Sequence, residues 1–435
     1  MDNKYNKVTF SVSKDIITPA QITTMIGFPS TFGKPFTEVH DDLYVKTLML
    51  RDADGETLLF ISMDILFHDD SLPETLRDYA SEKYGVKREN LHVTYTHTHF
   101  GPAVKGYDFN FYSESYEKFL FERVCCTIDR VFLTSHTGYL KFSKVSGEWN
   151  MSRRLPVNGK IEFEPNPLGE VDKNLYMLKL EDENGKMRVL ALSFACHPSN
   201  MWGIYTRLSS EYPGRLCARV EGEFYGTTAM FFQGFGADCK LRIGVKTNSF
   251  AECTPEDIDE VALTMTQRIK SKLISNDWET LPAKFASRTM KLELPLEINP
   301  IDYYQYCYDY YNERNAEMMK RNSEMVLENY DNLPETLLLN YGVIRINPKF
   351  YICSMGGEPG VNVQTVLRES MPEATLLCFG YNDAIAYIPS DKMIEEGGYE
   401  AEESVTEYRL KGRIAPGVDK IFCDALKNTV AEMNK

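Results

Sequence analysis

Short apolar runs alternate with longer amphipathic segments along nearly the whole chain. The runs are rich in β-branched and aromatic residues, and the one that begins at Val8 alternates apolar and polar positions as a half-buried strand does. The later runs predict strands at Leu43–Leu50, Leu58–Met63, Leu91–Thr96, Tyr139–Lys144, Leu175–Leu180, Arg188–Phe194, Thr228–Phe232, Lys284–Leu294, Leu337–Arg345, Phe350–Met355 and Thr375–Tyr381. Strands interleaved with helices predict an α/β fold whose functional residues gather at strand ends.

The segments between these runs carry apolar residues at three- and four-residue spacing, which predicts helices. The clearest start signal is Thr254-Pro-Glu-Asp257, a capping threonine followed by a proline and a carboxylate, and this helix should extend to about Leu273. The polar segment Ile301–Tyr330 predicts one long helix, whose tyrosines either line a pocket or, as helical spacing favours, pack inside. Further helices are predicted at Leu72–Tyr84, Tyr116–Phe132, Val361–Ser370 and Val418–Met433, and from about Tyr212.

Charge and cysteine usage narrow the class of function. The 435 residues include 48 basic and 63 acidic side chains, and the resulting charge of −15 repels nucleic acid and anionic lipid headgroups. The start of the chain lacks a secretory signal, and no stretch approaches the ~18 apolar residues of a membrane span. The ten cysteines form no Cys-x-x-Cys pair, which disfavours a thiolate metal site. We therefore expect a cytoplasmic protein with reduced thiols and a small-molecule substrate, with neither nucleic acid nor membrane as partner and with its oligomeric state open.

Histidines follow two of the predicted strands, although the chain has only seven. His97 and His99 end the strand at Leu91–Thr96, and residues two apart on a strand point the same way, so both can face one pocket. His197 ends another apolar run and precedes a proline. Each histidine could instead be a polar residue at a strand end, but two such positions in a histidine-poor chain favour a metal site.

A carboxylate and two phenols follow two further strands. Glu358 lies in the Gly-Gly-Glu-Pro-Gly segment, whose glycines permit a tight turn before a predicted helix. It could be a ligand, or only an anion that caps the helix. Tyr381 ends the strand at Thr375–Tyr381 and Tyr387 follows that strand, and spacing alone singles out neither.

Taken together, these motifs and several further segments resemble the catalytic domain of the neutral (alkaline) ceramidases and their bacterial relatives. The matching segments occur in the family's order over roughly residues 10 to 400, at Asp15–Pro19, His40–Lys46, Ile61–Ile65, Thr96–Pro102, Asn150–Arg154, Val171–Lys179, Ala195–Pro198, Phe232–Asp238, Gly356–Pro359 and Asn382–Tyr387. The resemblance implies mixed β-sheets flanked by helices in a single catalytic domain over residues 1–435. It leaves no room after about residue 405 for the C-terminal β-sandwich of the secreted ceramidases.

The resemblance also implies a ligand set for one Zn²⁺. The family's ligands are the first histidine of the His-Thr-His motif, the histidine of the His-Pro segment, the glutamate of the Gly-Glu pair and a downstream tyrosine. Carried over position by position, they are His97, His197, Glu358 and Tyr387. Tyr387 is preferred to Tyr381 because its distances from Asn382 and Tyr399 fit the family pattern better.

Three further residues are predicted to take part in catalysis. His99 could orient the substrate or move a proton. Arg153 matches a family arginine near the reacting carbonyl, although it could be a surface residue beside Arg154. Lys240 occupies the position of the family's nucleophilic serine, which this chain lacks. Lys240 or His99 could assist a metal-activated water, Lys240 could pair with a substrate carboxylate or phosphate, or catalysis could be lost. The role of Asp64 is open.

These residues together predict a zinc-dependent hydrolase. Imidazoles and oxygen anions suit zinc, and a metal with room for water can lower the pKa of that water to about 7. The expected reaction is attack of metal-activated water on the carbonyl of an amide (N-acyl) bond in a small soluble substrate. The alternatives are a metal-dependent enzyme that acts on a sugar derivative or an ester, and a metal-stabilised binding protein without turnover.

Overall fold

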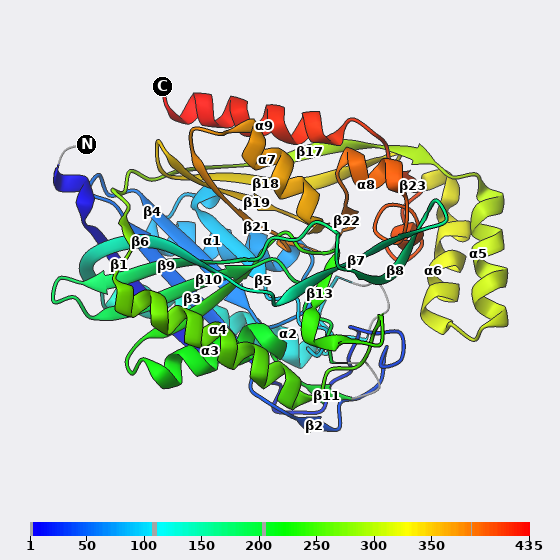
Figure 1. Ribbon diagram of the computed structural model, residues 1–435, viewed down its shortest axis with the longest axis horizontal. Helices are drawn as coiled ribbons and strands as arrows, with labels where there is room; N and C mark the ends of the chain where they lie inside the picture. The colour runs from blue at the N-terminus through cyan, green and yellow to red at the C-terminus, as the bar shows by residue number, and fades with distance from the viewer. Residues whose placement is uncertain (1–2, 107–110, 202–205, 384) are drawn as a thin grey trace.

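The predicted alternation of strands and helices produces two sheets that pack face to face, with helices on their outer sides (Figure 1). The computed structural model describes residues 3–106, 111–201, 206–383 and 385–435. Within these residues the larger sheet has nine strands, in the order β12 (Thr228–Gln233), β10 (Met187–Phe194), β9 (Asn174–Asp182), β6 (His136–Ser146), β1 (Val8–Ile16), β3 (Tyr44–Arg51), β4 (Thr57–Met63) and β5 (Leu91–Tyr95), with β16 (Glu279–Thr280) beside β6. Parallel and antiparallel pairs are both present, so the prediction of mixed sheets in an α/β fold is confirmed.

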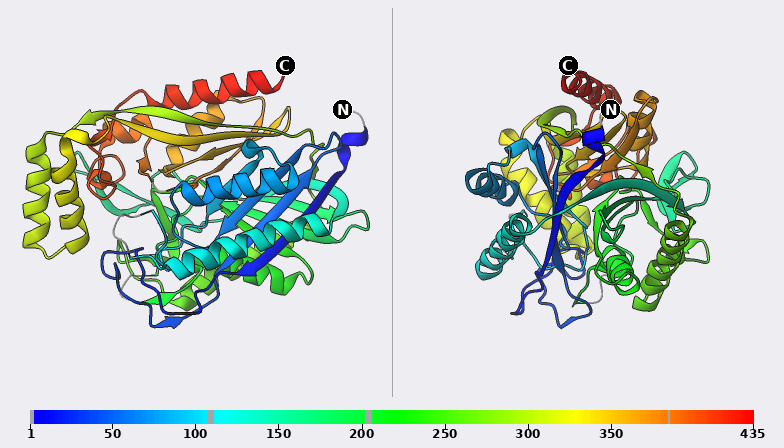
Figure 2. Two further views of the ribbon diagram at one scale, coloured as in Figure 1. Left: turned by 180° about the vertical axis from the view of Figure 1, so that it is seen from behind. Right: turned by 90° about the vertical axis from the view of Figure 1, so that its left-hand side faces the viewer.

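The larger sheet bends so that its two ends approach each other. The hydroxyl of Ser62 in β4 donates a hydrogen bond to the carbonyl oxygen of Phe231 in β12, at 2.6 Å. The outer side of one wing packs on α1 (Ser71–Tyr84) and α2 (Glu114–Leu133), and that of the other wing on α3 (Glu211–Glu223) and α4 (Pro255–Ser275) (Figure 2). The predicted start of α4 is confirmed, since Thr254 and Asp257 form a capping box with Pro255 in the first turn.

A smaller sheet lies across the inner face of the larger one. Its strands follow the order β21 (Thr375–Phe379), β19 (Phe350–Met355), β18 (Thr336–Asn347), β17 (Ala286–Ile298) and β23 (Gly412–Ile414). Alternate residues of each strand serve two cores: Ile352 packs toward the larger sheet, whereas Cys353 packs toward α7 (Val361–Ser370) and α9 (Val418–Met433). This double burial explains why these strands read as nearly continuous apolar runs.

The segment 301–330 forms two helices instead of the one that the sequence predicted. They are α5 (Ile301–Glu313) and α6 (Glu317–Asn329), which lie side by side at one end of the molecule (Figures 1 and 2). Asn315 between them has a left-handed φ of 53°, a conformation that asparagine tolerates better than most residues. The break thus rests on one residue, in a stretch without glycine or proline.

Short elements complete the fold, and most were absent from the prediction. A three-stranded sheet joins β13 (Cys239–Leu241), β7 (Asn150–Val157) and β8 (Lys160–Asn166). Asn158 and Gly159, both at positive φ, make the two-residue turn between β7 and β8, a hairpin signal that was readable in the sequence. The remaining elements are β20 (Glu358–Pro359) with β22 (Tyr387–Ile388), β2 (Glu38–Val39) with β11 (Arg207–Leu208), β14 (Val245–Lys246) with β15 (Ser249–Phe250), and α8 (Asp391–Glu396).

The structure also bears on the predictions made for membrane spans and for the cysteines. In the part of the chain that the structure describes, no helix combines the length and apolar character needed to cross a bilayer. All ten cysteines are free, and eight of them are buried, as expected of thiols in apolar runs.

A buried histidine ties the segment after β4 to α2. The ring of His68 lies 2.8 Å from Glu117 Oε2 and 3.1 Å from Asp69 Oδ1. Burial alone would lower the pKa of His68, but the hydrogen bonds to Asp69 and Glu117 outweigh it and raise the pKa to about 9. This segment also contains Leu66, whose carbonyl oxygen accepts a hydrogen bond from His97 Nδ1.

The raised pKa of His68 predicts a pH-dependent contribution to stability. The contribution is fully present below the unfolded-state pKa of about 6.5 and is lost as the pH rises through 9. We expect His68→Gln to lower the free energy of unfolding by about 2 kcal/mol at pH 6 and by much less at pH 9.5, measured by urea titration. His136→Gln, at an exposed position of β6, is the control. An equal loss at both pH values would contradict the prediction.

Candidate functional site

All of the residues that the sequence singled out for the site lie around one pocket. Its volume is about 360 Å³. Its lining includes the predicted residues His97, His99, Arg153, His197, Lys240, Glu358 and Tyr387. Asp64, whose role the sequence left open, is buried and accepts a hydrogen bond from Tyr44 N at 2.9 Å, and it does not line the pocket.

Backbone hydrogen bonds at the end of β21 draw strands from both sheets together at this pocket. Gly380 N donates to Gln233 O at the end of β12, at 2.8 Å, and Tyr95 N at the end of β5 donates to Tyr381 O at 3.1 Å. The hydroxyl of Thr94 donates to Gly380 O at 3.0 Å. The segments that follow β5, β10, β12, β19 and β21 therefore start close to one another and contribute the side chains of the site.

His97 reaches the pocket through a turn and not through strand alternation. The strand β5 ends at Tyr95, and His97 has a left-handed φ of 62°, a conformation that is uncommon for residues other than glycine. His97 and His99 do face one pocket as predicted, with ring centroids 5.0 Å apart, but a turn and not strand alternation brings them there. His97 Nδ1–H donates to Leu66 O at 2.9 Å, so the lone pair of Nε2 faces the pocket.

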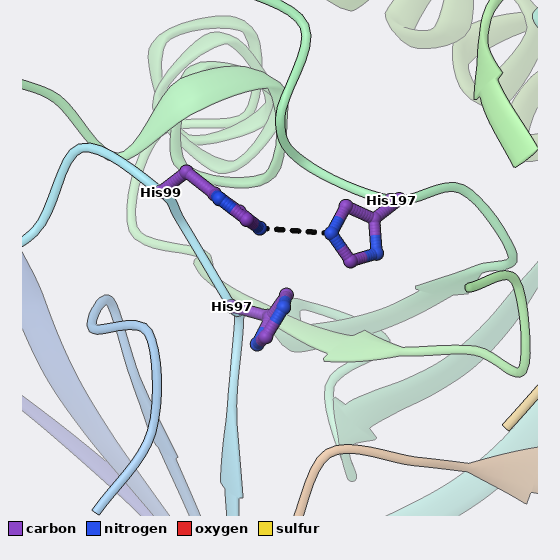
Figure 3. A group of neighbouring side chains, drawn as sticks. All are labelled: His97, His99 and His197. Atoms are coloured by element: carbon purple, nitrogen blue, oxygen red, sulfur yellow. Dashed lines mark hydrogen bonds between the residues drawn. The ribbon is translucent and has the colours of Figure 1, made fainter. Parts of the chain in front are cut away.

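His99 and His197 are joined by a hydrogen bond that fixes both tautomers (Figure 3). His99 Nδ1 can only donate to the carbonyl of Gly27, so its Nε2 accepts from His197 Nε2–H at 2.8 Å. The lone pair of His197 is then on Nδ1. Gly27 permits this contact because a Cβ at that position would lie 2.0 Å from His99 O. Burial lowers the pKa of His99 and of His197 well below the usual value and keeps both rings neutral.

Glu358 points one carboxylate oxygen at these lone pairs. It lies in β20, which pairs with β22 so that Glu358 is directly opposite Tyr387. Tyr408 OH donates to Oε1, whereas Oε2 lies 3.4 Å from His97 Nε2 and 3.5 Å from His197 Nδ1. The alternative role as a helix cap is wrong, because Val361 N at the start of α7 is bonded to Asp238 Oδ1, at 2.8 Å.

These atoms fit a divalent cation. Among the residues described, His97 Nε2 and Glu358 Oε2 are buried without a hydrogen-bond partner, and both carry lone pairs. Two ligands bound at about 2.0–2.1 Å to one tetrahedral zinc lie about 3.3–3.4 Å apart, close to the 3.4 and 3.5 Å separations here. The ligating atoms of His97, His99 and His197 all lie within 4.8 Å of one another, so this group could hold a metal.

Two tyrosines compete for the remaining ligand position. Tyr381 OH lies 3.2 Å from His197 Nδ1, and its ring lies 4.5 Å from that of His97, behind the pocket wall. Tyr387 lines the pocket, with its ring 6.3 Å from that of His197. Burial raises the pKa of both phenols well above the usual value, the charge of Glu358 raises it further, and the Arg153 guanidinium opposes the rise. The choice of Tyr387 as ligand remains a prediction.

Two cations line the side of the pocket formed by β7 and β13. Arg153 is only 3% exposed, so its alternative role as a surface arginine is wrong. Its Nε donates to Glu400 Oε1 at 2.8 Å, and its guanidinium lies 5.5 Å from the ring centroid of Tyr387. Lys240 is 8% exposed. Burial, reinforced by the charge of Arg153, lowers the pKa of Lys240 to about 8.

Several pocket residues were missed from the sequence. Glu407 is half-buried and accepts a hydrogen bond from Tyr399 OH; its partial burial raises its pKa to about 7. Ser199 follows the His-Pro pair. From the α5–α6 hairpin, the pocket receives Tyr311, Met318 and Met319. The sequence favoured a packing role over a pocket-lining role for the tyrosines of α5. Tyr304 is fully buried, as that prediction requires, whereas Tyr311 lines the pocket.

Comparison with known proteins supports the fold that the motifs implied. No family model matches the sequence. The structure is similar to a crystal structure of neutral ceramidase from Pseudomonas aeruginosa, with a TM-score of 0.75 and 15% identity over 98% of this chain and 74% of that chain. It is also similar to a ceramidase complexed with C2, with a TM-score of 0.76 and 15% identity over 98% and 75% of the two chains. The fold of the chain is therefore that of the neutral ceramidases, as the sequence predicted.

The lone-pair arrangement predicts which variants lose a bound metal. We expect His97→Ala and Glu358→Gln each to weaken Zn²⁺ binding by about 100-fold or more. Each substitution removes a metal-ligating atom that has no hydrogen-bond partner among the described residues, or weakens that atom by removing its negative charge. Competition with a chromophoric chelator measures the affinity. His40→Ala removes an exposed imidazole and should leave the affinity unchanged. Equal affinities for wild type and Glu358→Gln would contradict the assignment.

Proposed function

We propose that this chain is a metal-dependent hydrolase that cleaves the C–N bond of an N-acyl amide in a small substrate. The observation that carries the proposal is that His97 Nε2 and Glu358 Oε2, both buried without a hydrogen-bond partner among the described residues, lie close to each other and to His197 Nδ1 beside a pocket that can admit a substrate. The similarity to proteins named ceramidases supports the bond type, because a ceramide is an N-acyl amide.

Zn²⁺ is the metal we propose. Neutral imidazoles and carboxylate or phenolate oxygens suit zinc, and thiolates are missing from the pocket lining among the residues described. The proposed ligands are His97, His197, Glu358 and Tyr387. When bound there, the ion supplies Lewis acidity, which polarises a substrate carbonyl and lowers the pKa of water.

The side chains around these ligands supply the other requirements of amide hydrolysis. His99 is neutral, and its hydrogen bond to the Gly27 carbonyl holds its ring beside His197. We assign to it the transfer of a proton within the pocket, as the sequence suggested. Arg153 is buried with Nη2 unpartnered among the described residues, so it can donate to an oxygen that gains negative charge. Glu400, which pairs with Arg153 and Arg154, holds the guanidinium in place.

A water molecule is the nucleophile in this proposal, since Lys240 replaces the family's serine. Ser199 offers a hydroxyl in the same pocket, so it is the natural competitor. Its position two residues after His197 differs from that of the family's serine, which corresponds to Lys240.

Metal dependence is the first test. We expect the Zn²⁺-loaded protein to hydrolyse members of a panel of small N-acyl amides, chelation to abolish turnover, and added Zn²⁺ to restore it. Release of free amine measures the reaction. Turnover of esters or acylated sugars alone would assign a different substrate class. Bound zinc without turnover on any substrate would overturn the hydrolase and leave a binding protein.

Two variants separate the roles inside the pocket. We expect His99→Ala to lower kcat by about 100-fold because a proton-transfer group is lost, with zinc still bound. Ser199→Ala should lower kcat by less than about 10-fold, because a water attacks and not the hydroxyl. Steady-state kinetics with parallel metal analysis measures both. A loss for Ser199→Ala as large as that for His99→Ala would replace water with a serine nucleophile.

A further inference from the structure

Lys240 is a buried ammonium without an anionic partner. Its side chain is 8% exposed and lines the pocket, and no carboxylate among residues 3–106, 111–201, 206–383 and 385–435 forms an ion pair with it. Its Nζ lies 5.7 Å from the ring centroid of Phe250. Buried charges in proteins are normally paired because desolvation is costly, so an unpaired one inside a pocket points to a ligand.

The buried acid whose charge acts on Lys240 does not fill this role. Glu211 acts on Lys240 only through its charge, and both of its oxygens are engaged. Oε1 accepts from Asn200 N and Nδ2 at 3.0 Å, and Oε2 accepts from Tyr212 N at 2.7 Å. Glu211 therefore stabilises the turn into α3 and forms no ion pair with Lys240. The ammonium of Lys240 is available to bind a ligand in the pocket.

A second cation lies beside Lys240 on the same three-stranded sheet. Lys240 is directly opposite Met151, and Arg153 is two residues further along β7, so the two cations are diagonal neighbours on one face. Arg153 keeps Nη2 without a hydrogen-bond partner although its Nε is bonded to Glu400. Two buried cations that repel each other, each with free donors, form a site for an anionic oxygen group.

This anion site adjoins the candidate metal centre. The carbonyl of Cys239, the residue before Lys240, accepts the backbone hydrogen bond of His197 at 2.9 Å. Lys240 and the three histidines also line the same pocket, so a group held by Lys240 shares that pocket with an amide carbonyl placed at the histidines. Glu358 and Glu407 line the same pocket, and their charges disfavour a dianion.

We propose that the pocket selects substrates with a carboxylate close to the scissile amide, as in N-acyl amino acids, and that Lys240 binds this carboxylate with help from Arg153. The identity of the bond that is cleaved rests on the proposed function, whereas the anion site does not. The sequence left two roles for Lys240 open, and its unpaired burial favours recognition over proton transfer.

Binding of matched ligands tests the proposal without turnover. The ligands are N-acetylglycine and its neutral counterpart N-acetylglycinamide, titrated calorimetrically into the full-length protein with Zn²⁺ bound and again after chelation, to separate Lys240 from the metal. We expect wild type to bind the carboxylate at least about 10-fold more tightly in both states. Lys240→Met should abolish this preference, and Lys240→Arg should retain most of it. Lys246→Met, at an exposed position on β14, is the matched control.

The outcomes separate this inference from the proposed function. Equal binding of the two ligands by wild type, or a preference that survives in Lys240→Met, overturns the inference whatever the enzyme hydrolyses. Tighter binding of inorganic phosphate than of N-acetylglycine assigns the site to phosphate and overturns the carboxylate. A Lys240-dependent preference in a protein that cleaves no amide upholds the anion site and overturns only the hydrolase.

Thermal stability of the free protein distinguishes a ligand-binding lysine from a structural one. Removing an unpaired buried charge relieves its desolvation, so we expect Lys240→Met to melt at the same temperature as wild type or higher. Differential scanning fluorimetry measures this, and it also verifies that the variant folds. A large drop in melting temperature would indicate that Lys240 supports the fold, and would overturn its assignment to a ligand.

Discussion

The backbone junction at Gly380 and Tyr381 is the constraint on which the site depends. Hydrogen bonds there connect the end of β21 to the ends of β5 and β12, which belong to the other sheet. The larger sheet must bend to make this contact, and the bend brings its two ends close enough for His97 and His197 to meet. The four proposed metal ligands come from four separate segments, so no local piece of chain can form the site by itself. Loss of the junction would disperse the ligands while leaving each helix and most strands intact.

Two regions of opposite electrostatic character result within one pocket. On one side, carbonyl acceptors fix the tautomers of His97 and His99, and the remaining lone pairs of His97 and His197 face Glu358, an arrangement that suits a cation. On the other side, Lys240 and Arg153 supply donors in excess and suit an anion. A ligand that carries a carbonyl next to a carboxylate matches both. Met318 and Met319 add apolar side chains to the lining of the same pocket.

Much of this arrangement could be predicted from the sequence, because buried strands leave continuous apolar runs and the chemistry follows directly after them. His97, His197 and Glu358 were recognisable for that reason. The hairpin of β7 and β8 was missed although Asn158-Gly159 signalled it, and the break at Asn315 had no glycine or proline to mark it. Glu407 lies in a polar segment without periodicity, so only the tertiary structure identifies it. The left-handed φ of His97 is likewise set by contacts distant in sequence, such as the Leu66 carbonyl.

The α5–α6 hairpin is inserted between two paired strands of the smaller sheet, β17 and β18, and leaves that pairing undisturbed. It contributes three side chains to the pocket wall and, among the pocket residues described, none of the proposed metal ligands. Part of the pocket wall and the proposed metal ligands thus come from separable parts of the polypeptide. Relatives could exchange this excursion for a longer, shorter or differently shaped one and acquire new substrates while the metal centre stays the same.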